Sequence, residues 1–251
     1  MKMLRLGLAV SLLAATAAIT TTSAAPTPEL QILSMVNQAR ASQGLVPLRS
    51  DPRLWVLADE RAAVMAGANE LSHSVAGSIP DGLSRQGVQW YLHGEVIAYT
   101  SGSAAASLFE LWATSPPHWA LLTHRSFNYL GIGLAYSSSG LAYGSIVLTE
   151  SKDRTGPRAK MVKATVSGDD VRWTWSGSDT ALQTHTAGLR NFGVQQRTDG
   201  GSWVTVSSGT TSTARSAPNR ARGHSYGLRV RARDRAGNVG PWSAELRVRV
   251  P

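Results

Sequence analysis

The sequence predicts two domains in tandem: an α+β domain built as a three-layer α/β/α sandwich, and after it an all-β sandwich. Three observations lead to this expectation. Helical periodicity and antiparallel strand patterns occupy the chain up to residue 150. Short alternating strands dominate after residue 160, and the net charge changes sign between the two parts.

The composition is that of a globular protein with two unlike surfaces. Hydrophobic residues make up 42% of the 251 residues, and charged residues 16%. Residues 26–150 contain six Lys or Arg and nine Asp or Glu, a net charge of −3, whereas residues 151–251 contain seventeen and seven, a net charge of +10. The lack of cysteine excludes disulfide bonds, thiolate metal sites and cysteine nucleophiles.

Residues 1–25 have the pattern of a secretory signal peptide. Lys2 and Arg5 form a positive start, residues 6–18 are mostly apolar, and Thr22-Ser23-Ala24 fits a small-residue cleavage site. No second long hydrophobic run follows. We therefore expect a secreted, extracellular protein whose mature chain has no transmembrane segment.

Two helices are expected near the start of the first domain, residues 26–150. Thr27-Pro28 and Asp51-Pro52 each combine a capping side chain with a proline at the first helical position. Apolar positions follow at helical spacing, and Gly44 and Gly67 end the two patterns. The predicted helical faces consist of Leu30, Leu33, Val36 and Arg40, widened by Ile32 and Met35, and of Leu54, Leu57, Ala58, Arg61, Ala62 and Met65.

The stretch "LWATSPPHW", residues 111–119, marks the junction of two further helices. The first begins at Ser101 or Ser103 and must end at the two prolines, because proline lacks an amide hydrogen and clashes with the preceding turn. Ser115 is expected to cap the next helix. Trp112 then belongs to the core, and His118 falls in the first turn of the new helix.

Strand patterns complete both domains. In the first domain they cover residues 95–100, 130–136 and 141–149, and "SSSG" joins the last two as a hairpin. The charged segment 151–160 is the predicted linker, and the sandwich occupies residues 161–251. Its predicted strands are residues 171–175, 193–198, 202–206, 226–234 and 245–250. In the fourth of these, alternation turns Leu228, Val230 and Ala232 inward, and Arg229, Arg231 and Arg233 outward.

Several motifs in residues 26–150 together resemble the bacterial secreted branch of the CAP superfamily, which comprises cysteine-rich secretory, antigen 5 and pathogenesis-related 1 proteins. They are "VNQARASQGLVPL", "LADERAAVMA", "SHS", "HGEVIA", "LWATSPPH" and "YLGIGLA". The resemblance implies an α/β/α sandwich with a surface cleft where two histidines and two acids meet. His73, Glu95 and His118 match three of these positions. Ser115 replaces the second acid, and Val96 replaces an asparagine.

Two interpretations of this cleft remain open. His73, Glu95 and His118 can act as ligands of a divalent metal such as Zn²⁺, with water in the open position. Alternatively, the histidines hydrogen-bond to Glu95 and fix the shape of the cleft. The sequence contains neither G-x-S-x-G nor H-E-x-x-H, and a Ser115–His118 pair lacks an orienting acid.

We therefore expect binding of a small ligand, metal, lipid or peptide and no catalysis. One alternative is a metal-dependent extracellular hydrolase that acts on wall or peptide substrates, and another is a non-catalytic interaction protein.

Residues 161–251 resemble fibronectin type III-like modules, an immunoglobulin-like architecture, through "WTWSGSD" and "GHSYGLRVRARDRAGNVGPWS". Such modules bind or space, and Tyr226 and Trp242 are expected to pack there. The positive charge would suit phosphate backbones. For an exported protein, however, cell-wall polymers and anionic lipid headgroups are the available partners, and no nucleic acid is expected. The alternative is a charged face that is only solvated.

Overall fold

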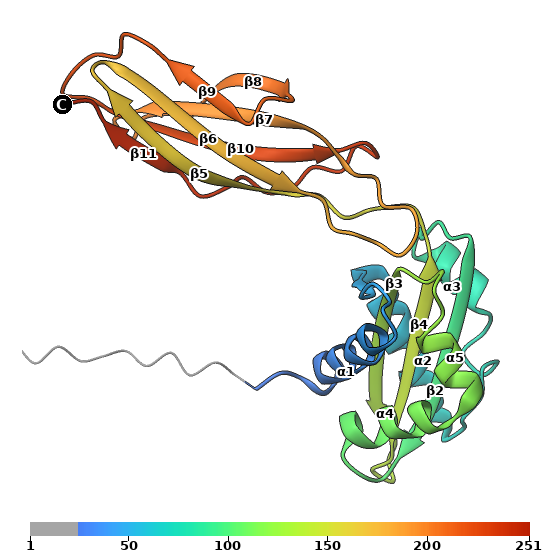
Figure 1. Cartoon of the computed structure of the whole chain (residues 1–251). Coiled ribbons are helices and arrows are strands. Elements are labelled where there is room, and N and C mark those ends of the chain that lie inside the picture. The colour runs from blue at the N-terminus through green and yellow to red at the C-terminus, as the bar shows by residue number, and fades with distance from the viewer. Residues whose placement is uncertain (1–24) are drawn as a thin grey trace, which may run out of the picture.

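A computed structural model describes residues 25–251 (Figure 1). The predicted signal peptide lies outside this range apart from its last residue. The elements of the first domain are α1 (Pro28–Ser42), β1 (Arg49–Ser50), α2 (Pro52–Ala68), α3 (Ile79–Arg85), β2 (Leu92–Thr100), α4 (Ala104–Thr114), α5 (Pro116–Leu122), β3 (Tyr129–Tyr136) and β4 (Ala142–Glu150). The sheet order is β1-β3-β4-β2, in which β1 runs parallel to β3 and the other neighbours are antiparallel.

The predicted three-layer arrangement is confirmed. Helices α2 and α3 pack on one face of the sheet, and α1, α4 and α5 pack on the other. Trp112 is fully buried between α4 and the sheet, as expected. Because β2 is an edge strand, groups from both helical layers can approach each other around it.

The helix starts follow the sequence signals, with one correction. Thr27 and Asp51 accept hydrogen bonds from the amides of Leu30 and Arg53, at 3.4 and 3.0 Å. Ser115 occupies the N-cap position of α5, but its side chain accepts no capping hydrogen bond, so the expected cap is only positional. Helix α2 also runs past Gly67 to Ala68 and ends with Asn69 in the left-handed conformation.

The buried face of α1 is narrower than predicted. Ile32, Val36 and Arg40, spaced four residues apart, are fully buried, whereas Leu30 is 47% exposed. Arg40 donates to the backbone oxygens of Val46, Leu122, His124 and Phe127. Burial lowers the pKa of Arg40 to about 10, so this buried guanidinium remains charged at neutral pH.

The second domain is the predicted all-β sandwich. Its strands are β5 (Arg158–Ser167), β6 (Asp170–Ser178), β7 (Leu189–Thr198), β8 (Val204–Thr210), β9 (Ala214–Ala217), β10 (Ser225–Asp234) and β11 (Leu246–Arg249). They form two antiparallel sheets, β5-β6-β9 and β11-β10-β7-β8. Leu228, Val230 and Ala232 are fully buried between the sheets, which confirms the alternation predicted for this strand.

The two domains are joined by more than a linker. Strand β5 begins at Arg158, so the last three residues of the predicted linker 151–160 lie in a strand. The loop between β6 and β7 contacts the first domain (Figure 1), where Gln183 Oε1 accepts from the amide of Val46 at 2.8 Å. Leu182 of the same loop packs in the cluster that contains Leu54. None of the helices in residues 25–251 has the length and apolarity needed to cross a membrane.

Candidate functional site

Glu95 is the centre of the predicted cleft and is held by four hydrogen bonds. It lies on β2 with its side chain on the sheet face that α2 covers, and it is 7% exposed. Two nitrogens of the Arg61 guanidinium donate hydrogen bonds to the Glu95 carboxylate, Nε to Oε1 and Nη2 to Oε2. Ser145 on the neighbouring strand β4 donates to Oε1 at 2.9 Å, and His73 Nδ1 lies 2.7 Å from Oε2.

Arg61 on helix α2 links Glu95 to the segment that contains His73. It is 1% exposed and, besides Glu95, donates to the backbone oxygens of His73 at 2.6 Å and Gly77 at 2.9 Å. The planar guanidinium therefore fixes both the carboxylate and the segment between α2 and α3 that carries His73. A bidentate arginine–carboxylate pair of this kind is strong and directional.

His73 has one ring nitrogen, Nε2, that makes no hydrogen bond within residues 25–251. Its side chain is 60% exposed, and its Nδ1 contacts Glu95 Oε2. A carboxylate only accepts hydrogen bonds, so Nδ1 carries a proton, and in the neutral tautomer that this contact selects the lone pair is on Nε2. Glu95 thus sets both the tautomer and the orientation of the His73 ring.

His118 lies in the first turn of α5, as predicted, and has an orphaned nitrogen. Its Nδ1 is buried and has no hydrogen-bond partner. Burial lowers the pKa of His118, and the nearby His73 lowers this pKa further. The imidazole of His118 is therefore mainly neutral at pH 7, and His73 is close enough to influence its charge.

These contacts bear on the expected metal ligands. Each oxygen of Glu95 already accepts two hydrogen bonds, so neither is free to coordinate a metal. The two histidines are chemically suited to a metal, because His73 Nε2 and His118 Nδ1 each lack a hydrogen-bond partner within residues 25–251. With a metal bound, Glu95 would orient a ligating histidine and would not itself be a ligand, a common arrangement around metals.

Within residues 25–251, only one set of three His, Asp or Glu side chains places ligand atoms within 4.8 Å of one another, and it lies elsewhere. It consists of Asp153, Asp179 and Asp234, near the junction of the two domains. Asp153 and Asp234 are buried. Burial raises the pKa of Asp179, and the neighbouring Asp153 raises it further. His73, Glu95 and His118 do not form such a set.

Ser115 is half-buried beside His118, but no hydrogen bond joins the two side chains in the part of the chain that the structure describes. The Ser–His pair considered from the sequence is therefore not formed. Sequence reasoning missed Arg61 and Ser145 as partners of Glu95. The available signal was the arginine within the apolar face of α2, because an arginine at a core position needs a buried partner.

A comparison with family models identifies the family of the first domain. The model described as the cysteine-rich secretory protein family, CAP, matches residues 33–149. These residues form a CAP domain. The expected resemblance is thereby confirmed, and residues 33–149 contain all four predicted cleft residues, His73, Glu95, Ser115 and His118. A comparison with curated protein sequences finds no match.

Solved structures are similar to each domain separately. An extracellular protein containing an SCP domain from Bacillus anthracis is 26% identical, with a TM-score of 0.42, over 48% of this chain and 40% of its own. An outer surface protein from Borrelia burgdorferi is 18% identical, with a TM-score of 0.45, over 50% of this chain and 95% of its own. An Fn3-like protein from Clostridium thermocellum is 23% identical, with a TM-score of 0.28, over 39% of this chain and 96% of its own.

Proposed function

We propose that the protein is a secreted binding protein whose CAP cleft takes up a small ligand or a divalent metal through His73 and His118. The observation that supports this most directly is the pair of imidazole nitrogens without protein partners, beside a carboxylate that is fully engaged. The signal-like N-terminus supports secretion. Binding is favoured over hydrolysis because Glu95 has no free lone pair for a proton and Ser115 does not pair with His118.

A metal such as Zn²⁺ would be held by His73 Nε2 and His118 Nδ1 and would supply a positive centre for an oxygen of the ligand. The role of the protein is to prepare these two nitrogens. Glu95 keeps the proton of His73 on Nδ1, and Arg61 keeps Glu95 in place. Burial keeps His118 unprotonated. Peptides and lipids remain ligands that the same cleft could take without a metal.

The metal form of this proposal predicts a specific binding pattern. Zn²⁺ titrated calorimetrically at pH 7 is expected to bind one site, and His73→Ala or His118→Ala is expected to weaken binding at least about 10-fold. Glu95→Gln should weaken it by about 10–100-fold, because the histidine loses its orienting partner. Binding should fall as the pH drops below about 6, where protons compete for the imidazoles.

His224→Ala is the matched control. His224 lies in the second domain, where its Nδ1 contacts Asp199, and its loss is expected to leave the affinity for Zn²⁺ unchanged. Equal weak binding by the parent protein and both cleft variants would exclude the metal at this site.

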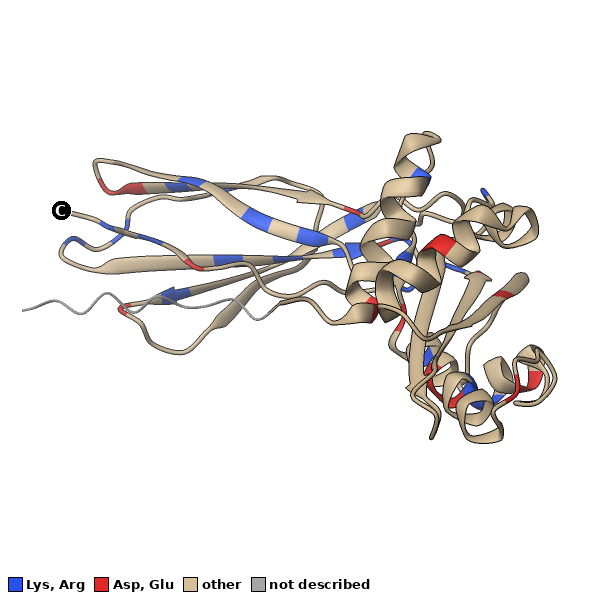
Figure 2. Ribbon diagram, turned by 90° about the horizontal axis from the view of Figure 1, so that it is seen from below, with Lys and Arg blue, Asp and Glu red and all other residues tan. Residues whose placement is uncertain are grey.

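We further propose that the basic sandwich tethers the CAP domain to an anionic extracellular surface, such as a cell-wall polymer. Its Lys and Arg residues are distributed along the strands (Figure 2). Several of them are held in place by stacking, because Arg229 Cζ lies 4.2 Å from the ring centroid of Trp203, and Arg231 Cζ lies 4.6 Å from that of Trp242. Stacked guanidinium groups keep their charge and lose side-chain freedom, which favours binding to anions.

The tether predicts binding that depends on salt. The protein should bind isolated bacterial wall material at low ionic strength and be released in about 1 M NaCl, where the screening length is about 3 Å. An uncharged polysaccharide such as cellulose is the control and should not retain it. Retention on wall material that is indifferent to salt would contradict an electrostatic tether.

A further inference from the structure

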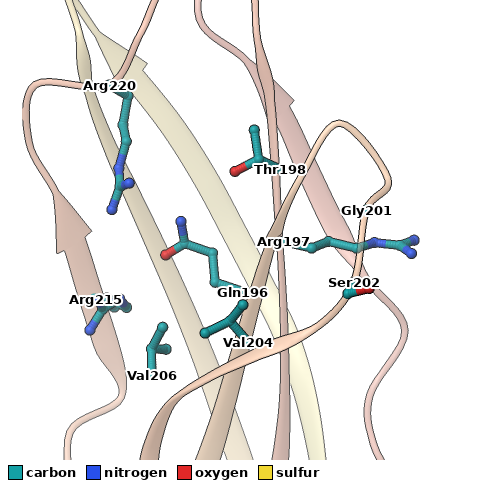
Figure 3. Close-up of a pocket in the computed structure, with 9 residues that line it drawn as sticks. All are labelled: Gln196, Arg197, Thr198, Gly201, Ser202, Val204, Val206, Arg215 and Arg220. Carbon is teal, nitrogen blue, oxygen red and sulfur yellow. The ribbon is translucent and has the colours of Figure 1, made fainter.

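The sandwich contains a pocket that neither domain's expected role explains. It encloses about 400 Å³ and opens between β8, at the edge of one sheet, and β9, at the edge of the other (Figure 3). Strands β8 and β9 do not pair with each other, so the pocket lies at an unpaired side of the sandwich. Clefts of about 300–1,000 Å³ are the usual size for small-molecule ligands.

Gln196 brings an unpaired polar group into this opening. The inward positions of β7 are Phe192, Val194 and Gln196, and the first two are core residues. Gln196 is only 8% exposed, yet its Oε1 has no hydrogen-bond partner. A buried amide without a partner is costly, because it has lost its hydrogen bonds to water. Its side chain points into the pocket (Figure 3).

Two arginines line the same pocket without a carboxylate partner. Arg215 on β9 and Arg220 in the following loop each have a buried Nε that makes no hydrogen bond, and neither forms an ion pair within residues 25–251. Arg220 is positioned over the ring of Tyr226, with Cζ 5.4 Å from the ring centroid. Arg197 differs, because it points away from Gln196 (Figure 3) and pairs with Glu245.

We propose that this pocket binds an anionic sugar unit, a saccharide ring that carries a carboxylate or a phosphate. The inference rests on the proposed tether and assigns it a specific site. Arg215 and Arg220 would hold the anionic group, because the guanidinium fork matches the oxygens of carboxylate and phosphate. Gln196 would bond to a sugar hydroxyl, since an amide both donates and accepts.

The remaining lining favours a sugar over a bare anion. Thr198 and Ser202 add hydroxyl groups to the lining, and Val204, which is 62% exposed, offers an apolar surface for ring C–H groups. A free phosphate would use the arginines and leave Gln196 unpaired. A lipid headgroup would use the same two arginines, but the apolar side chains lining the pocket are confined to the two valines, Val204 and Val206.

The test uses the full protein in about 0.15 M salt, where the screening length is about 8 Å. Glucuronate, glucose 6-phosphate, glucose, inorganic phosphate and phosphatidylglycerol vesicles are titrated separately. ¹H–¹⁵N NMR follows the Nε signals of Arg215 and Arg220 and the side-chain amide of Gln196. At least one anionic sugar should shift these signals and bind about 10-fold more tightly than glucose or inorganic phosphate. A response to glucuronate alone assigns a carboxylate, and a response to glucose 6-phosphate alone assigns a phosphate.

Matched variants complete the test. Arg215→Met and Arg220→Met should each weaken the preferred sugar about 10-fold, the loss of one charge-assisted contact. Arg233→Met removes the same charge from an exposed position of β10 outside the pocket and should change the affinity less than 2-fold. The ligand-induced changes in the NMR signals of the parent protein do not depend on whether any variant folds.

Three results would overturn the proposal that this pocket binds an anionic sugar. They are equal binding of glucose or inorganic phosphate, an equal loss with Arg233→Met, and shifts caused only by phosphatidylglycerol vesicles. Each is distinct from failure of the tether, because salt-sensitive retention on wall material could persist through the other arginines. Loss of that retention would instead remove the tether itself.

Discussion

Arg61→Met is expected to lower the free energy of unfolding of the CAP domain by about 3–5 kcal/mol. The substitution leaves the Glu95 carboxylate, 7% exposed, without its cation. It also leaves the backbone oxygens of His73 and Gly77 without their donor. A buried charge that loses its partner costs far more than an exposed one, because water cannot replace the lost interaction.

The measurement must report on the first domain alone, since the chain has two domains and its unfolding need not be two-state. Urea unfolding followed by the indole NMR signal of Trp112, a fully buried residue of this domain, meets that need. Arg85→Met is the matched control. Arg85 pairs with Glu60 at 3.8 Å with its side chain 59% exposed, so its loss should cost no more than about 1 kcal/mol.

A second substitution tests whether the unpaired Glu95 carboxylate causes the loss of stability in Arg61→Met. Glu95→Leu combined with Arg61→Met removes the stranded carboxylate and is expected to recover part of the stability that Arg61→Met loses. A loss below about 1 kcal/mol for Arg61→Met alone would contradict the assigned role, because it would mean that Glu95 finds other partners at little cost.

The helices and strands that the sequence predicted are those whose signals are local. Thr27 and Asp51 cap α1 and α2 through bonds to amides two or three residues away, and such bonds are visible in a short stretch of sequence. The alternation in β10 likewise required only neighbouring residues, and it correctly separated buried Leu228 from the arginine beside it.

Most of the elements that were missed depend on distant parts of the chain or are short. Strand β5 is the exception, because it has ten residues and pairs with the next strand, β6. Strand β1 has two residues and exists through parallel pairing with β3, about eighty positions later in the sequence. Strand β9 has four residues and pairs with β6. Helix α3 has seven residues, too few for a helical pattern, although Ser78 does cap it through the amide of Asp81.

The candidate site shows the same limit. The motifs correctly indicated that His73 and Glu95 lie together, because a family resemblance carries three-dimensional information that spacing lacks. The role of Arg61 could not be derived from its helical face alone, since Arg40 occupies a similar position in α1 and binds only backbone oxygens. Only the opposing strand distinguishes an ion pair from a set of carbonyl contacts.

Gly131→Ala is expected to destabilise the CAP domain by about 3 kcal/mol, at the upper end of the range for overpacking. A Cβ at Gly131 would lie 2.0 Å from the carbonyl carbon of Leu54, and one at Gly133 would lie 2.2 Å from that of Ala58. Both glycines of "LGIG" therefore allow the backbone of α2 to rest directly on β3. Alanine would push the helix away from the sheet, and because α2 carries Arg61, the ion pair with Glu95 would be disturbed as well.

The control for this substitution has the opposite expected sign. Gly67 lies near the end of the same helix, and a Cβ there would meet nothing within 4 Å. Gly67→Ala is expected to stabilise the domain by about 0.4–1 kcal/mol, because alanine restricts the unfolded chain and favours the helix. The urea midpoint of the Trp112 signal should thus move down for one variant and up for the other. Similar midpoints for both would contradict direct contact between α2 and β3, since only that contact makes the two positions differ.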